Sequence, residues 1–193
     1  MACGLMLITI YMSGVSQVTV VRVLSAIFLG SVATEYLRLR HPSLNAVCVR
    51  MMGFFMRTHE VKSVSGMPYY AASCLLAIAI FPRDVAILSL LFLTFGDPVA
   101  SLVGILFRER SIPILKGKSF HGTAAAYIVC ALATWLYLKS TGMHGLSLIR
   151  MTLLGGFAGA LAELLPLDID DNFTIPLVSG LILWLGFIAI HFA

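Results

Sequence analysis

Lys118 and its neighbours form an unusually polar stretch in a sequence that is otherwise rich in apolar residues. Residues 115–123 read LKGKSFHGT and hold two lysines, two glycines and two hydroxyl side chains. Gly117, Lys118 and Ser119 match the last three positions of a Walker A phosphate loop. That motif also needs a glycine five residues before Gly117, where this chain has Ile112. The stretch is therefore either a solvated basic loop or a phosphate site of another kind.

Two acidic residues, Asp97 and Glu163, lie inside apolar runs that read LLFLTFGDPVASLVGILF and GGFAGALAELLPL. A carboxylate deep in a membrane helix costs roughly 2.5 to 3.5 kcal/mol on insertion scales, so it usually faces a cavity, a cation or a basic partner. The pattern favours a functional role for both residues. The alternative is a buried salt bridge to Arg22 or Arg150.

The neighbours of Asp97 support this interpretation. Gly96 and Pro98 flank it and loosen the helix at that point. Ser101 and Gly104 follow at helical spacing, which predicts a small, polar face beside the carboxylate.

A third acidic group lies in the stretch PLDIDDNFTIPLVSG, where Asp168, Asp170 and Asp171 are followed by Asn172. Gathered oxygen ligands of this kind suit Mg²⁺, which normally binds through one or two carboxylates and the phosphates of a nucleotide. One of these residues is also expected to cap the helix that follows. A cap needs one acid, however, and this stretch has three.

The elements that must position these residues are membrane helices. The chain has 193 residues, of which 60% are hydrophobic and 11% charged, and its mean hydropathy is +0.98. These values exclude an ordinary soluble fold and indicate an integral membrane protein. We therefore predict one all-α, polytopic domain over residues 1–193. The four cysteines lie far apart without a Cys-x-x-Cys pair, so they suggest neither a zinc site nor a disulfide framework.

Six apolar runs are long enough to approach the roughly 20 residues that a spanning helix needs. They cover residues 17–38, 67–82, 85–107, 122–138, 146–165 and 174–192. Residues 3–12 are too short to cross alone and form half a span, an interfacial piece or the remnant of a longer helix, so we expect about six to seven transmembrane helices. Residues 44–56 place Leu44, Val47, Cys48, Met51, Met52 and Phe55 on one side, as expected of an amphipathic helix at the membrane interface.

The basic residues predict the orientation of these spans, because they collect in cytoplasmic loops. Nine fall on one side of the six-span order: Arg38, Arg40, Arg50, Arg57, Lys62, Arg108, Arg110, Lys116 and Lys118. Three fall on the other side: Arg83, Lys139 and Arg150. We therefore expect the loop that holds Lys118 and the loop that holds Asp170 to face the cytoplasm together, where nucleotides are available.

These stretches occur in the order found in a known family. FGDPVASLVG, KGKSFHGT and AELLPLDIDDNFTIPLVSG resemble the CTP-dependent lipid kinases, which include diacylglycerol kinase of the yeast type, dolichol kinase and phytol kinase. Upstream, ATEYLRLRHPSLN and RTHEVKSVSGMPYY resemble that family's Glu-x-x-Arg segment and its Arg-x-x-Glu segment followed by glycine. The resemblance covers residues 35–180, and the Arg57-x-x-Glu60 segment with the DDNFTIPLVSG ending is most similar to the diacylglycerol kinases.

The resemblance implies phosphoryl transfer from CTP to the hydroxyl of a membrane lipid, with Mg²⁺ or another divalent cation and with no nucleic acid as partner. It makes KGKSFHGT a nucleotide loop: Lys118 offers a charge to a phosphate, Ser119 and Thr123 offer hydroxyls, and Gly117 and Gly122 let the backbone approach. A helix that begins at Gly122 would point its positive end at the same anion.

The remaining roles are shared among the acidic residues. Catalysis is expected of Lys118 together with Asp97, Glu163 and Asp170, and metal binding of Asp97, Glu163, Asp168, Asp170 and Asp171. Arg57, Glu60 and Asn172 are expected to support the site, although Arg57 and Glu60 also fit an ordinary interfacial ion pair. His121 is a candidate base, but a histidine at a helix start is more often a polar cap.

Several alternatives remain open from the sequence. The acceptor is either diacylglycerol, which would give phosphatidate, or a long isoprenoid alcohol such as dolichol or phytol. A membrane cytidylyltransferase acting on phosphatidate would also bind CTP and Mg²⁺. A small transporter or scaffold would explain the spans but not the shared face of the two polar loops. The expected location is a multi-pass position in the membrane, the inner membrane if the cell is prokaryotic.

Overall fold

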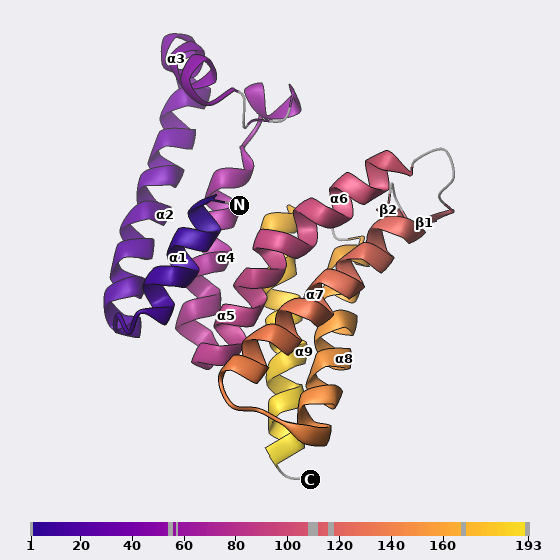
Figure 1. Cartoon of the computed structure of the whole chain (residues 1–193). Coiled ribbons are helices and arrows are strands. Elements are labelled where there is room, and N and C mark those ends of the chain that lie inside the picture. Colours follow the sequence, from indigo (N-terminus) through magenta and orange to yellow (C-terminus); the bar gives the residue numbers. More distant parts are fainter. Residues whose placement is uncertain are drawn as a thin grey trace.

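The computed structural model describes residues 2–53, 56, 58–107, 112–115, 118–166 and 169–191. In chain order the elements are α1 (Ala2–Met12), α2 (Gln17–Arg40), α3 (Pro42–Met52), the 3-10 turn η2 (Thr58–Val61), α4 (Gly66–Ile80), α5 (Arg83–Leu91), the π turn η3 (Phe92–Gly96), α6 (Asp97–Leu106), the strands β1 (Pro113–Leu115) and β2 (Lys118–Ser119), α7 (Phe120–Ser140), α8 (Gly145–Leu164) and α9 (Asp171–His191). Figure 1 shows α1, α2 and α4 on one side and α6 to α9 on the other, with α5 between them.

The expected all-α, polytopic membrane fold is confirmed. Five helical segments of 20 to 24 residues are long and apolar enough to cross a membrane: α2, the continuous α5–η3–α6 segment, α7, α8 and α9. The run at 67–82, which the sequence analysis treated as a sixth span, is the shorter helix α4 of 15 residues. Residues 3–12 form most of α1, a short apolar helix of 11 residues.

The expected interfacial helix is α3. Leu44, Val47 and Met51 are 44%, 54% and 78% exposed, so much of the apolar side of this helix is not covered by the described chain. Pro42 starts the helix, where its missing N–H has no helical partner to lose. An exposed apolar side on a short helix suits a position along the membrane surface. Phe55, also expected on this side, lies outside the described residues.

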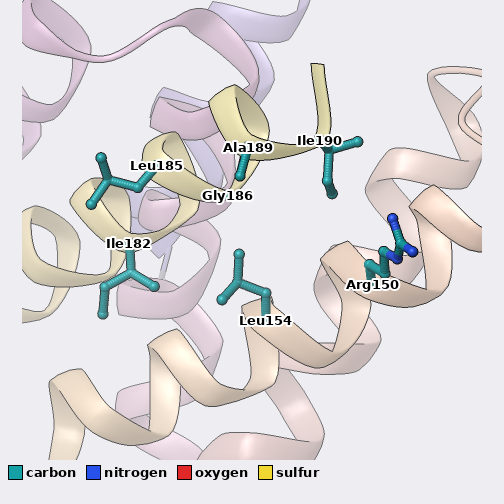
Figure 2. A pocket seen from close by; sticks show the side chains of 7 residues that line it. All are labelled: Arg150, Leu154, Ile182, Leu185, Gly186, Ala189 and Ile190. Carbon is teal, nitrogen blue, oxygen red and sulfur yellow. The ribbon is translucent and has the colours of Figure 1, made fainter. Parts of the chain in front are cut away.

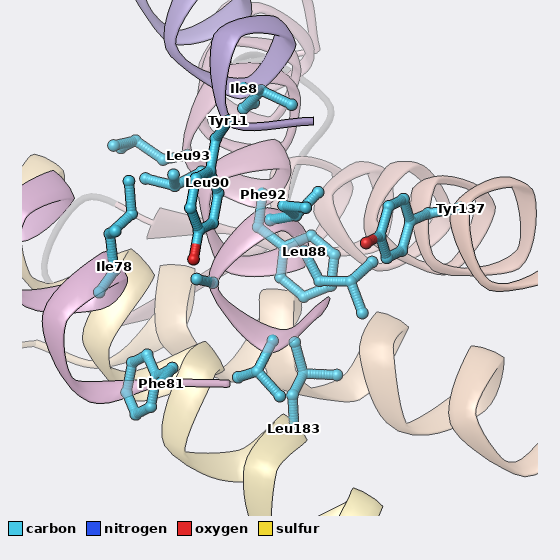
Figure 3. Packing of buried hydrophobic residues seen from close by; sticks show 14 of the residues in the cluster. Ile8, Tyr11, Ile78, Phe81, Leu88, Leu90, Phe92, Leu93, Tyr137 and Leu183 are labelled. Carbon is cyan, nitrogen blue, oxygen red and sulfur yellow. The ribbon is translucent and has the colours of Figure 1, made fainter. Parts of the chain in front are cut away.

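The core of the molecule surrounds α5. Residues 85–90 of this helix are all buried, including Ile87 and Leu88, and residues from α1, α4, α7 and α9 pack around them. Figure 3 shows Leu88 near Phe92, Tyr137 and Leu183. Polar contacts join the same elements at one end of α5, where Tyr137 Oη donates a hydrogen bond of 2.6 Å to Asp84 Oδ1. A helix buried on all sides gives the flanking helices a common support.

A π turn separates α5 from α6. The Asp97 N–H bonds to the Phe92 carbonyl five residues earlier, where an α-helix would use the residue four before. Pro98 explains the local weakness, because it cannot donate to the Thr94 carbonyl and its ring crowds that group. The extra residue in the turn rotates the side chains that follow by roughly 100° about the helix axis. The sequence predicted a helix over 85–107 that loosens at Asp97, but it did not predict a π turn.

Candidate active site

Lys118 lies in a charged cluster at one end of the helix bundle. Its Nζ donates a hydrogen bond of 2.8 Å to Glu163 Oε2 and one of 2.9 Å to Asp171 Oδ2, and both contacts are ion pairs. Lys118 comes from the β1–β2 hairpin, Glu163 from the end of α8 and Asp171 from the start of α9. The fold therefore brings together residues from two loops that the sequence analysis assigned to one face.

Asp97 completes the acidic part of this cluster. One carboxylate oxygen each from Asp97, Glu163 and Asp171 lie within 4.8 Å of one another. Glu163 is buried and the other two are half-buried. Like charges this close repel unless a cation balances them. The Lys118 ammonium group supplies part of that balance. The sequence analysis considered Arg22 or Arg150 as the buried partner of these acids; for Glu163 the partner is Lys118.

The pairing with Glu163 and Asp171 raises the pKa of Lys118. Burial alone lowers the pKa of the ammonium group, but the hydrogen bonds and charges of Glu163 and Asp171 outweigh burial and raise the pKa above its ordinary value. Lys118 therefore stays protonated throughout the physiological pH range. Its side chain is 22% exposed and that of Asp171 is 29% exposed, so a polar ligand can reach the cluster from one side.

The hairpin around Lys118 leads directly into α7. Pro113 pairs with Ser119 and Leu115 with Lys118 in an antiparallel arrangement, where the sequence predicted only a loop. The helix begins at Phe120, so the predicted start at Gly122 was wrong by two residues. The reason is the cap: Ser119 Oγ accepts a hydrogen bond of 3.2 Å from the Gly122 N–H. Lys118 is thus separated from the positive end of α7 by a single residue.

The other predicted phosphate ligands have different surroundings. A Cβ on Gly122 would lie 2.9 Å from the Ala100 carbonyl oxygen, so this glycine permits the close approach of α6 and α7. Thr123 Oγ1 is buried and has no hydrogen-bond partner in the described part of the chain. The His121 ring stacks on Phe107 with 5.2 Å between ring centroids. Gly117 lies outside the described residues.

Asp170 serves as the cap that the sequence analysis expected from one of the three aspartates. Its Oδ1 accepts hydrogen bonds from the Asn172 backbone N–H at 2.9 Å and from Asn172 Nδ2 at 2.7 Å. As a result α9 begins at Asp171, three residues before the predicted start at Thr174. Asp171 reaches Lys118, and Asp170 is not one of the three clustered acids. Asp168, a predicted metal ligand, lies outside the described residues.

The loop before α4 lies against the start of α9. Glu60 Oε1 accepts a hydrogen bond of 3.1 Å from the Gly66 N–H. A Cβ on Gly66 would come within 2.8 Å of Asn172 Nδ2, so only glycine lets the two segments approach this closely. Glu60 and Asn172 therefore lie close to the start of α9, and their supporting role stays a prediction. Arg57, the predicted partner of Glu60, lies outside the described residues.

Arg38 holds this loop from the other side. Its guanidinium group donates two hydrogen bonds to the Glu35 carboxylate, at 2.9 and 2.7 Å, and one of 2.7 Å to the Ser63 carbonyl. It also bonds to Asn45 Oδ1 at 3.0 Å, while Glu35 accepts from the Ser65 N–H and hydroxyl. The Glu-x-x-Arg pattern was visible in the sequence, but its role as a clamp between α2 and the loop was not.

We expect Arg38→Gln to lower the free energy of unfolding by roughly 3–5 kcal/mol, because Arg38 is only 2% exposed and its loss leaves the Glu35 carboxylate without its cation. Unfolding by a denaturing detergent in mixed micelles measures the change. The matched control is Arg40→Gln on the same helix, since Arg40 is exposed and lies over the Tyr36 ring. Equal stability of the two variants would contradict the clamp.

Cys130 of α7 controls how closely the acid-bearing helices approach. A Cβ on Gly96, next to Asp97, would lie 2.8 Å from Cys130 Sγ. A Cβ on Gly159, one turn before Glu163, would also clash with Cys130 Sγ. Two glycines on either side of one small side chain let α6 and α8 close around α7, which brings Asp97 toward Glu163. The sequence contained these glycines but nothing that paired them with Cys130.

The fold and the cluster together define a polytopic helical membrane protein with a partly exposed lysine–carboxylate site at one end of its bundle. Comparison with known proteins supplies the family. The chain is 33% identical over 165 residues to CTP-dependent diacylglycerol kinase 1 of Eremothecium gossypii, covering 76% of this chain and 52% of that protein. It is 28% identical to the protein of the same name from Schizosaccharomyces pombe, covering 89% and 83%.

A third relative is a probable chloroplastic phytol kinase from Triticum aestivum, 30% identical over 87% of this chain and 66% of that protein. The chain belongs to the CTP-dependent lipid kinase family. It spans about half the length of the Eremothecium relative and a larger part of the other two. No family model and no solved structure matches the chain.

Proposed function

We propose that the chain transfers the γ-phosphoryl group of CTP to the hydroxyl of a membrane lipid, with diacylglycerol as the acceptor and phosphatidate as the product. The observation that carries the proposal is the contact of Lys118 with Glu163 and Asp171 beside Asp97. Phosphoryl transfer depends mainly on positioning and on neutralising the charge of the phosphates, and a lysine beside clustered carboxylates supplies both kinds of group. The family relatives named as diacylglycerol kinases support the choice of acceptor.

Asp97, Glu163 and Asp171 are the residues that would hold a divalent cation. Their oxygens come from three separate helix ends and lie within 4.8 Å of one another, which fits a hard cation that also binds phosphate oxygens. When bound, such a cation neutralises charge on the triphosphate. Lys118 bridges two of the three acids. If a cation took its place between those carboxylates, the Lys118 ammonium group would be released to contact the phosphates.

In the proposed reaction the lipid hydroxyl oxygen forms a bond to the γ-phosphorus. The bond between that phosphorus and the β–γ bridging oxygen breaks, and CDP leaves. The proton of the lipid hydroxyl passes to a carboxylate of the cluster. Because the cluster lies at the end of membrane helices, a lipid headgroup can approach along the bilayer surface while the nucleotide approaches from water.

An isoprenoid alcohol is the second candidate acceptor, supported by the phytol kinase relative. The test is an assay of the purified protein in detergent with CTP, ATP, GTP or UTP and with diacylglycerol, phytol, farnesol or dolichol. We expect the γ-phosphate label of CTP on the lipid, and no product after chelation of divalent cations. With phosphatidate as the lipid, label from the α-phosphate of CTP on the product would instead identify a cytidylyltransferase. No labelled lipid with any pair of substrates would overturn the proposal.

We also propose that the cluster faces the cytoplasm, on the basis of the nine-to-three distribution of basic residues. Single cysteines at Lys62, Lys118 and Asp170, in a variant without the four native cysteines, should resist a membrane-impermeant maleimide applied to intact cells. A cysteine at Lys139 is the control, since it lies at the opposite end of α7 and should react. Reaction at position 118 in intact cells would show that the orientation is the opposite of the one proposed.

A further inference from the structure

A groove opens between α8 and α9 at their ends remote from the lysine–carboxylate cluster. It has a volume of about 460 Å³ and is lined by Arg150 and Leu154 of α8 and by α9 residues that include Leu185, Gly186 and Ala189. Figure 2 shows Leu154 between the two helices, with the Arg150 guanidinium group near Ile190 at one end. Its volume falls within the range of roughly 300–1,000 Å³ that is usual for small-ligand sites.

The groove is separate from the reacting groups. Arg150 is near the start of α8, and Glu163 is near its end, which places them roughly 20 Å apart along the helix axis. The α9 residues of the groove likewise lie in the half of that helix opposite Asp171. An acceptor lipid in this groove could not reach the cluster with its hydroxyl.

The walls of the groove are apolar apart from Arg150. Gly186 of α9 lets α8 come close at the floor of the groove. A Cβ on Gly186 would clash with Leu154 Cδ2, so the floor of the groove is formed by direct contact between the helices. Leu185 is 57% exposed beside it, on a helix that is long and apolar enough to span the membrane. The groove therefore opens toward the acyl chains of the bilayer.

Arg150 is the charged group among the residues that line the groove. It is exposed and makes no hydrogen bond or ion pair with any described residue. It is also the sixth residue of a spanning helix, close enough to the helix end for its long side chain to reach the headgroup region of the bilayer. Of the described acids, Asp84 lies at the same end of the bundle, and its carboxylate already accepts the hydrogen bond from Tyr137.

We propose that the groove binds one phospholipid with an anionic headgroup. An acyl chain lies between α8 and α9 against Leu154 and Leu185. The headgroup phosphate accepts charge-assisted hydrogen bonds from Arg150, and these are strongest where no ammonium group of the same lipid offsets the phosphate charge. A second copy of this chain fits less well, because the one carboxylate that the described residues offer at its corresponding end, Asp84, is already bonded. The bound lipid sits in the leaflet opposite the cluster and joins the outer ends of the two helices.

Native mass spectrometry of the purified full-length chain tests this proposal without any nucleotide, so the result is independent of the proposed kinase activity. The probes are phosphatidylglycerol and phosphatidylcholine with the same acyl chains. We expect one phosphatidylglycerol bound in preference to phosphatidylcholine. Arg150→Gln should weaken that binding roughly ten- to hundred-fold, the usual effect of losing a charge-assisted hydrogen bond.

The matched control is Arg22→Gln, which should leave phosphatidylglycerol binding unchanged. Arg22 is also exposed and is also the sixth residue of its spanning helix, but it does not line the groove. Ala189→Leu keeps the charge and fills the groove, so it should weaken binding as well. Equal affinity for the two lipids, or equal losses in the two arginine variants, would overturn the proposal. A dimer that Ala189→Leu dissociates would assign the groove to a second copy instead.

Discussion

Lys118→Ala is expected to reduce CTP-dependent lipid phosphorylation by at least roughly 10- to 100-fold, because it removes a charge-assisted contact to a triphosphate worth about 1.5–3 kcal/mol. The loss grows if that contact strengthens in the transition state. The same change also leaves Glu163 and Asp171 without the cation that bridges them. The measurement is the rate of lipid phosphorylation at matched expression over a range of CTP concentrations.

Two further variants test whether the reaction needs the lysine side chain at position 118 or only a positive charge in this stretch. Lys118→Arg should not restore full activity, since the planar guanidinium group is larger than an ammonium group and differently hydrated. Lys116→Ala should be mild, because the sequence predicts Lys116 on the membrane-entry side of the same stretch, where anionic headgroups would satisfy its charge. Equal activities of the two alanine variants, or a larger defect in Lys116→Ala, would show that Lys118 is not the residue that contacts the phosphates.

Features that depend on local chemistry were predictable from the sequence. Long apolar runs indicated α2, α7, α8 and α9 within a few residues of their ends, because hydrophobic length is set by the bilayer. The unusual position of acids inside such runs identified Asp97 and Glu163, which the fold brings together with Asp171. The order of short polar stretches was enough to identify the family.

Features that depend on contacts between distant residues were not predictable. The packing of Cys130 between Gly96 and Gly159, for example, joins three separate helical segments. Composition also does not reveal that neighbouring aspartates have different contacts. Asp171 pairs with Lys118 and Asp170 caps α9, and this difference depends on how the helices pack. The sequence therefore identified candidate site residues, but which of them lie together depends on tertiary packing.

Asp97→Asn is expected to leave insertion and folding intact and to reduce lipid phosphorylation by at least roughly 100-fold. Asparagine keeps the shape of the side chain but removes the charge that would hold a divalent cation or accept a proton, and either role carries an effect of about that size. The position supports this expectation, because Asp97 follows the π turn and lies beside Glu163 and Asp171. The assay should record the rate against both CTP and Mg²⁺ concentration, with the thermal stability of each variant.

Asp84→Asn is the matched control, because Asp84 also lies in the α5–η3–α6 segment but at its other end, bonded to Tyr137. It should retain activity and lose only a little stability, because the asparagine oxygen still accepts the Tyr137 hydrogen bond but no longer carries a charge. If Asp97 binds the cation, Asp97→Asn should show a raised Mg²⁺ requirement as well as a lower rate, whereas a loss of proton transfer alone would leave that requirement unchanged. An Asp97→Asn protein as active as Asp84→Asn would remove Asp97 from the site, and the pair of Glu163 and Asp171 around Lys118 would have to serve the reaction without it.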